Sequence, residues 1–131
     1  YRTDIENAIN LEKQNSPNIK FLGNVTNPFQ VIKNPSFFFH FSGLDATPRA
    51  ILEAMANGFV VFATKNFGIP EMFNNNISGF LIKSPNNFSK LFTLVFNDDV
   101  KIAEISSSAK KHIHDYNKHE VVANFWKPYL K

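Results

Sequence analysis

The sequence predicts an α/β domain in which helices flank a parallel sheet. Three apolar runs of strand length, at residues 37–41, 59–63 and 79–82, have almost no polar alternation, as in strands covered on both faces. Helical segments lie between or after them, and the connections are short, which is the order expected of a parallel sheet. The 131 residues suit one domain over residues 1–131.

The N-terminal part is expected to contain two helices and one strand. Thr3 and Asp4 give an N-cap signal for a helix that ends before Ser16. Residues 19–22, followed by Gly23, have the composition of a short strand stopped by a turn. A brief helix is expected from Asn27-Pro28 through Ile32, ending where Asn34 precedes Pro35.

The remaining helices follow from capping and apolar spacing. A helix is expected from Pro48 to about Asn57, with Gly58 at its C-cap. Apolar residues within 88–95 share one helical face, and those within 102–113 share another. Asp98-Asp99 is interpreted as a helix start, and a last helix is expected around residues 121–129.

Composition excludes several classes of protein. The chain has no Cys, no apolar run close to the roughly 20 residues that span a bilayer, and no signal peptide, so we expect a cytoplasmic protein. The net charge is +3. A basic cluster near the C-terminus could make weak contact with an anionic membrane surface, although a solvated helix face is the simpler interpretation. No nucleic-acid partner is expected. The cluster consists of Lys110, Lys111, Lys118, Lys127 and Lys131.

The loop at residues 42–47 is the first candidate for a binding site. It follows a buried strand and leads into a helix, and ligands of open α/β sheets lie beyond the carboxyl ends of the strands. Thr47 is a good N-cap, and Pro48 fits the first helical position. The amides of Arg49, Ala50 and Ile51 would then lie at the positive end of the helix dipole. They would form an anion site suited to a diphosphate.

Two acids lie near this predicted anion site. Glu53 is five residues past Pro48, about 7.5 Å along the helix axis, which is roughly the distance from a pyrophosphate to its ribose. Its carboxylate could accept hydrogen bonds from both ribose hydroxyls. Asp45, in the loop before the helix, could bind sugar hydroxyls. The residues alone also allow a solvated Glu53 and an Asp45 bonded to its own backbone.

The segment DATPRAILEAMANGFVV, residues 45–61, resembles the signature of glycosyltransferase family 4 and its relatives of the GT-B fold. In that signature two acids are separated by seven residues and followed by Ala-Met-Ala, a variable residue, Gly and an apolar strand. A paired-Gly loop then leads to Ile-Pro-Glu, matched here by residues 67–71. Residues 18–23 and 78–82 match two further strands of the family, so the likeness covers nearly the whole chain.

The resemblance implies a nucleotide-sugar donor site without a further cofactor. Glu53 would bind the ribose, and Asp45 would contact the sugar near its anomeric carbon; we assign both to catalysis. The mouth of the helix at Thr47 and the amides of Pro48-Arg49-Ala50 would hold the diphosphate. The loop of Phe67, Gly68 and Ile69 would approach the donor. Two departures affect the sugar end: Asp45 is one methylene shorter than the usual Glu, and Phe67 replaces the first Gly of the pair.

No metal site is expected. His112 and His114 are two residues apart on a helix and do not share a face. We interpret His40 as a core or strand-end histidine, and no Asp-X-Asp pair is present. Transfer is therefore expected to be metal-independent.

The predicted function is the donor-binding half of a retaining glycosyltransferase that acts on a sugar, lipid or protein acceptor. As the C-terminal half of a GT-B fold lacking its first strands, the chain would need a missing N-terminal acceptor domain and be inactive alone. One alternative is a degenerate nucleotide-binding or interaction module without transfer. Another is a nucleotide-sugar epimerase, which would leave the sugar on the nucleotide. The base, the sugar and the acceptor are not fixed by the sequence.

Overall fold

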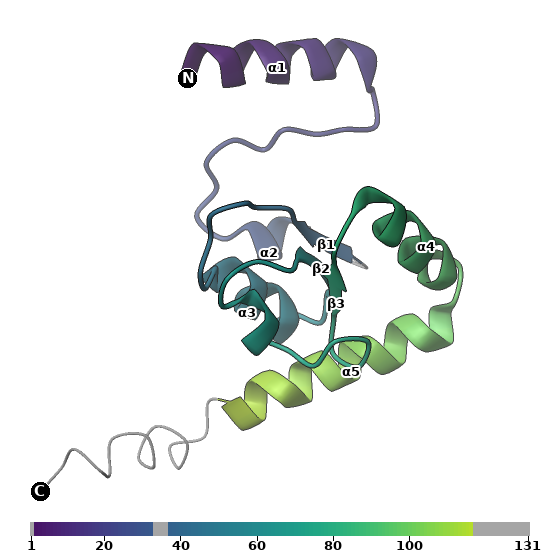
Figure 1. Ribbon diagram of the computed structural model, residues 1–131. Coiled ribbons are helices and arrows are strands. Elements are labelled where there is room, and N and C mark those ends of the chain that lie inside the picture. The colour runs from purple at the N-terminus through teal and green to yellow at the C-terminus, as the bar shows by residue number, and fades with distance from the viewer. Residues whose placement is uncertain (1, 33–36, 117–131) are drawn as a thin grey trace, which may run out of the picture. The chain divides into compact units, whose positions relative to one another are not determined.

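The computed structural model describes residues 2–32 and 37–116 (Figure 1). The chain divides into two compact units between Val31 and Ile32, and each is described by itself. The first unit contains α1, Arg2–Asn15, and α2, Pro28–Val31. Both helices were predicted. The single domain expected over residues 1–131 stays a prediction.

The strand predicted at residues 19–22 is wrong. This segment has no regular secondary structure, and Ile19, Phe21 and Leu22 are exposed. A strand needs a neighbour to pair its backbone N–H and C=O groups, and no described strand pairs with this segment. Gly23, at φ +68°, does form the expected turn.

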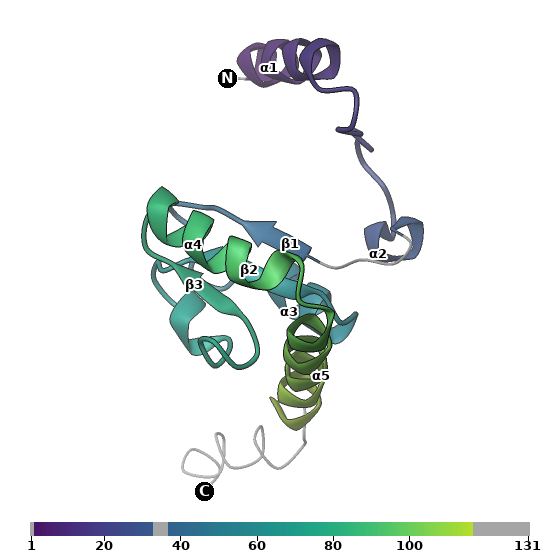
Figure 2. The same cartoon turned by 90° about the vertical axis from the view of Figure 1, so that its right-hand side faces the viewer.

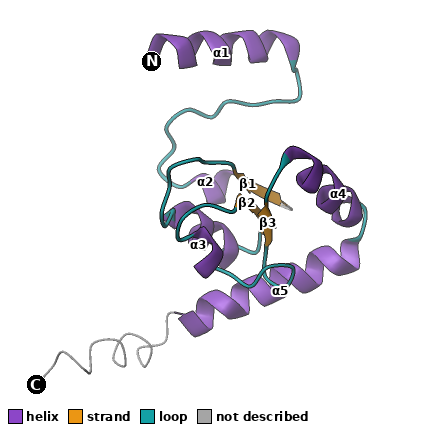
Figure 3. Ribbon diagram, in the orientation of Figure 1, coloured by secondary structure: helices purple, strands orange, loops and turns teal. Residues whose placement is uncertain are grey.

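The second unit is built on a parallel sheet, which confirms the predicted fold class. Its strands are β1, Phe37–His40, β2, Val60–Thr64, and β3, Phe80–Ile82, and they lie side by side in that order (Figure 3). Phe39 is in register with Phe62, and Phe62 with Phe80. All three carboxyl ends therefore lie at one edge of the sheet.

The strands differ in how completely they are covered. β2 and β3 are buried, as their unbroken apolar sequences predict. β1 is only partly covered: Phe39 is 45% exposed, and Phe41, just beyond the strand, is 55% exposed. The prediction that residues 37–41 are covered on both faces is therefore wrong for the described residues.

Helices pack on opposite faces of the sheet (Figure 2). α4, Pro85–Phe96, packs on the face that carries Phe62. α3, Arg49–Ala56, packs on the other face and also against α5, Asp99–Tyr116. A short 3-10 helix, η1, covers Ile69–Glu71. No helix within the described ranges is both long and apolar enough to cross a bilayer.

The α4 face is built from aromatic rings. The ring of Phe62 stacks on Phe80 with centroids 4.7 Å apart, and it also contacts the rings of Phe37, Phe39, Phe88 and Phe92. The Phe rings on this face thus form one connected layer, which fixes where α4 lies.

The helix ends follow local capping rules. α3 ends in a Schellman motif, in which Gly58 N–H donates to Met55 O and Phe59 N–H to Ala54 O, both at 3.0 Å. Gly58, at φ +83°, lies one position beyond the C-cap residue Asn57, not at the cap itself. Asp98 Oδ1 accepts from Lys101 N–H and starts α5, as predicted. The helix predicted at residues 121–129 lies outside the described residues.

Candidate functional site

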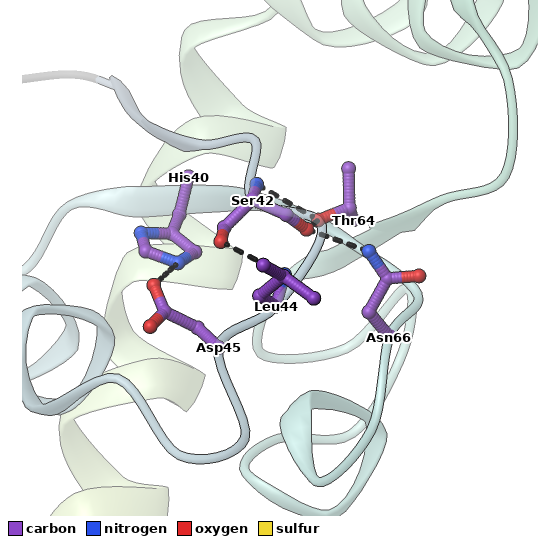
Figure 4. Close-up of polar contacts among 6 residues, drawn as sticks. All are labelled: His40, Ser42, Leu44, Asp45, Thr64 and Asn66. Atoms are coloured by element: carbon purple, nitrogen blue, oxygen red, sulfur yellow. Dashed lines mark hydrogen bonds and ion pairs between the residues drawn. The ribbon is translucent and has the colours of Figure 1, made fainter. Parts of the chain in front are cut away.

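Two loops are tied together at the carboxyl edge of the sheet (Figure 4). The carbonyl oxygen of Ser42, in the loop after β1, accepts from Thr64 Oγ1 at 2.7 Å and from Asn66 Nδ2 at 2.6 Å. Ser42 N–H donates back to Thr64 Oγ1 at 3.2 Å. Ser42 Oγ also accepts from Leu44 N–H, so the loop after β1 is held both to itself and to the end of β2.

Gly68 brings the same two loops into contact a second time. A Cβ at Gly68 would lie 2.5 Å from the carbonyl oxygen of Ala46 and 3.2 Å from Cγ2 of Thr47. No side chain fits that space, so the glycine is required by close approach. The paired-Gly loop, predicted to come near the donor, therefore lies against residues 46–47.

Phe67 has a backbone conformation that favours glycine. Its φ is +43°, in the left-handed region that Gly adopts without strain. The ring is 65% exposed, and the close approach of Gly68 to Ala46 is formed beside it. The substitution therefore adds backbone strain and an exposed ring, while the contact between the loops is kept.

The start of α3 differs from the prediction in two ways. Pro48, with ψ 114°, is the N-cap residue, so the helix begins at Arg49 and no side chain caps it. Thr47 is therefore not the N-cap; an extended Pro48 moves the helix start one residue along the chain. Ile51 N–H donates to Pro48 O at 3.1 Å, so it is not available to an anion. The amides of Arg49 and Ala50 remain, since the first N–H groups of a helix have no intrahelical acceptor.

Asp45 lies beside His40, the last residue of β1 (Figure 4). Asp45 Oδ2 is 3.1 Å from His40 Nε2, and the Asp45 side chain is 53% exposed whereas that of His40 is 17% exposed. Nε2 itself is buried, and the two atoms approach without the alignment of a hydrogen bond. His40 is thus a strand-end histidine, as interpreted from the sequence, and it limits where the Asp45 carboxylate can lie.

Glu53 lies on the exposed side of α3. Together with Arg49 and Ile113 it lines a hollow of about 230 Å³ between α3 and α5. The carboxylate of Glu53 has no hydrogen bond or ion pair with any residue that the structure describes. A charged group with no structural partner is available to a ligand.

The predicted site residues therefore fall into two groups. Asp45, Thr47, Pro48 and Gly68 gather where the loops meet α3, whereas Glu53 and Arg49 line the hollow beside α5. Ala50 lies in the first turn of α3 and is partly buried. Ile69 is fully buried, so only its backbone could approach a donor.

A cavity at this edge is lined by none of the residues predicted from the sequence to bind the donor. It has a volume of about 600 Å³ and lies beyond the carboxyl ends of β2 and β3. Lys65 and Lys83 directly follow these strands, and that position was the sequence signal that could have identified them. The lining residues are Phe41, Thr64, Lys65, Asn66, Ile82, Lys83, Ser84, Pro85 and Phe88.

The histidines of α5 do not converge. His112 stacks on Tyr116 with ring centroids 6.4 Å apart, and His114 Nδ1 lies 3.5 Å from Asp115 Oδ1. In the described ranges no three His, Cys, Asp or Glu side chains gather into a metal-binding group. Of the basic cluster, Lys110 and Lys111 lie on α5 and are exposed, and the other three lysines lie outside the described residues. Membrane contact stays a prediction.

A match to a protein-family model shows which family the chain belongs to. The model described as glycosyl transferases group 1 matches residues 5–112 of the chain. The chain belongs to this family. The match includes the loop after β1, α3 and the Gly68 loop, so the resemblance inferred from residues 45–61 is confirmed.

Solved structures show the same fold. HepE from Anabaena in complex with UDP superposes with a TM-score of 0.76 over 98% of this chain and 37% of HepE, at 22% identity. The C-terminal domain of LpcC, a glycosyl transferase group 1 family protein from Francisella tularensis, gives a TM-score of 0.66 over 88% of this chain and 64% of that domain, at 18% identity. The fold is thus that of the C-terminal domains of GT-B glycosyltransferases, as predicted.

The matched part of HepE is small. HepE in complex with UDP-glucose superposes with a TM-score of 0.56 over 69% of this chain and 27% of HepE, at 24% identity. The chain therefore spans between 27% and 37% of HepE. No curated protein matches the chain significantly.

Proposed function

We propose that this chain is the donor-binding domain of a retaining glycosyltransferase and binds a nucleoside-diphosphate sugar at the start of α3. The observation that carries the proposal is the close approach of Gly68 to Ala46, which brings two loops together beside Asp45 and the first amides of α3. Family membership and the HepE complexes with UDP and UDP-glucose support the same ligand class. The acceptor would bind to a separate domain.

Each end of the donor has a partner of suitable chemistry. The diphosphate would lie against the amides of Arg49 and Ala50, where the helix dipole favours negative charge. During transfer the bond between the anomeric carbon and the diphosphate oxygen breaks, and the diphosphate leaves with the electron pair. Amides held at that position would stabilise the developing charge without reorganisation. The new bond forms to an acceptor hydroxyl oxygen, and the hydroxyl proton passes to the leaving diphosphate.

The two acids would position the rest of the donor. The unpartnered carboxylate of Glu53 would accept hydrogen bonds from the ribose hydroxyls. Asp45 would accept from a sugar hydroxyl, and its approach to His40 Nε2 would keep the short side chain in one place. No step in this scheme uses a metal ion.

A second candidate is a nucleotide-binding module without transfer. It is favoured by the sugar end of the site, where Asp45 already lies 3.1 Å from His40 and where Phe67 presents an exposed ring. In this case the nucleotide would bind, but the sugar would gain no hydrogen bond from Asp45. Equal affinities for a nucleoside diphosphate and its sugar conjugate would favour the module over the transferase.

The test is ligand-observed NMR of the chain with UDP, GDP and ADP. One nucleotide should bind, and Glu53→Ala should weaken its binding about tenfold, because two hydrogen bonds to a carboxylate are lost. Glu104→Ala is the matched control, since Glu104 is an exposed acid on α5, away from the site. Failure of all three nucleotides to bind would contradict the proposal. Equal weakening by both substitutions would remove the ribose role of Glu53.

A further inference from the structure

The cavity beyond β2 and β3 has one apolar side and one basic side. Phe41 and Phe88 meet edge to face with ring centroids 5.3 Å apart, and Ile82 and Pro85 extend this apolar wall. Lys65 and Lys83 lie on the loops that leave the two strands. The volume of about 600 Å³ falls within the range of small-molecule sites.

The charges around this cavity are not neutralised by the protein. Neither Lys65 nor Lys83 forms an ion pair with a described residue, and no Asp or Glu is among the lining residues. Two ammonium groups at the rim of an apolar cavity favour a ligand that carries negative charge and an apolar group together. A fully hydrated anion would leave the Phe41–Phe88 wall without a partner.

The polar atoms inside the cavity are mostly committed to holding the loops. Thr64 Oγ1 donates to the Ser42 carbonyl oxygen and accepts from Ser42 N–H, and Asn66 Nδ2 donates to the same oxygen. Ser84 Oγ accepts from Asn87 N–H as the cap of α4. The lysines are therefore the groups that would select the ligand, while the remaining wall is fixed by internal hydrogen bonds.

We propose that this cavity is a second ligand site, which binds the phosphate ester of an apolar ring or chain. The apolar group packs against Phe41 and Phe88, and the phosphate lies between Lys65 and Lys83. The site is separate from the proposed donor site, because it includes neither the start of α3 nor Glu53. It stands whether or not a nucleotide sugar binds at α3.

The probes are phenyl phosphate and hexyl phosphate, titrated into the chain and followed by amide chemical shifts. Phenol and inorganic phosphate serve as the two fragments and should each bind more weakly than the esters. The combined substitution of Lys65→Gln and Lys83→Gln should weaken binding about fivefold or more, and Lys111→Gln, an exposed lysine on α5, should leave it unchanged. Shifts should centre on residues 64–66 and 82–88. The tighter ester shows whether a ring or a chain fits.

The outcomes separate this site from the donor site. Ester binding that depends on the two lysines and persists in Glu53→Ala supports the proposal, even if UDP does not bind. Absence of binding at millimolar concentration, or binding that both lysine substitutions leave unchanged, overturns it. Loss of ester binding in Glu53→Ala also overturns it, because the two sites would then be one. Preserved dispersion of the amide signals verifies that each variant is folded.

Discussion

Residues 60–63 of β2 are fully buried, whereas the loops that follow β1 and β2 expose most of their side chains. The strand is held by apolar contacts on both faces. The loops are held by the hydrogen bonds of Ser42 and by the close approach of Gly68 to Ala46. The sheet interior and its carboxyl edge are therefore stabilised by different interactions.

This difference shows which residues are free for binding. At the edge, a few backbone and hydroxyl groups fix the loops, and the charged side chains of Lys65 and Lys83 have no described partner. The carboxylate of Glu53, on the exposed side of α3, has none either. Substitutions of buried residues in the sheet interior should therefore lower stability most. Substitutions of the groups that hold the two loops together should lower it less, and substitutions of the charged side chains should lower it least. Each of the following predictions tests one step of that order.

The largest loss of stability is expected from a substitution of Phe62. Phe62→Ala removes a fully buried ring that contacts five other Phe rings, and it should lower the free energy of unfolding by about 3–5 kcal/mol. A loss of that size can unfold a small domain. Phe62→Leu, which keeps most of the volume, should cost about 1 kcal/mol and can be measured by urea unfolding if the Ala variant does not fold. A loss under 1 kcal/mol for Phe62→Ala would show that the aromatic layer is not the core.

The second-largest loss of stability is expected from a substitution of Gly68. In Gly68→Ala the new Cβ would meet Ala46 O, so the two loops must move apart at a cost of about 1–3 kcal/mol. Gly43→Ala is the matched control, since nothing lies within 4 Å of a Cβ there. Urea unfolding measures both. Equal stabilities would mean that the loops are not in contact in solution, and the proposed donor site would lose its support.

A smaller effect is expected at Thr64. Thr64→Val keeps the shape but removes the hydroxyl that bonds both backbone groups of Ser42, which should cost about 1 kcal/mol. Thr93→Val removes a hydroxyl that bonds only its own exposed helix, and it should change stability by less than about 0.5 kcal/mol. Hydrogen exchange at residues 42–44 should also be faster in Thr64→Val. Equal effects of the two substitutions would remove Thr64 as a link between the loops.

The sequence was a good guide where local rules decide the structure. The buried strands, the helix over residues 49–56 and the two C-terminal helices follow from apolar periodicity and from caps such as Asp98. The candidate loops at residues 42–47 and 67–69 were also found, because strand ends and glycines mark them. These features depend on neighbours that are close in the chain.

The predictions from sequence are wrong where residues far apart in the chain determine the structure. Residues 19–22 have strand composition but no described strand to pair with, and β1 has an unbroken apolar sequence although it is only partly covered. The helix start moved from Pro48 to Arg49 because of one backbone angle. The cavity was missed because its walls come from three separate segments, which only the folded sheet brings together.

Substitution of Phe67 by Gly should have a small effect on stability, and its sign should be opposite to the others: the free energy of unfolding should rise. Its left-handed backbone costs about 1–2 kcal/mol, which Phe67→Gly removes, but the added freedom of Gly in the unfolded chain offsets about half or more of the gain. The variant should be more stable by at most about 1 kcal/mol. Asn76→Gly, at φ +64°, should gain less, because Asn tolerates this conformation better. A clear loss of stability in Phe67→Gly would show that the exposed ring packs against something at this edge.

The smallest effect on stability is expected at Glu53. Its carboxylate has no described partner, so Glu53→Gln should change the free energy of unfolding by less than about 0.5 kcal/mol, as should Glu104→Gln on α5. Nucleotide affinity should separate the two variants, because Gln accepts hydrogen bonds from a ribose diol more weakly than a carboxylate does. Parallel unfolding and binding measurements give both quantities. A stability loss above 1 kcal/mol for Glu53→Gln alone would mean that the acid supports the α3–α5 packing, and Glu53 could no longer be counted among the charges that are free for binding.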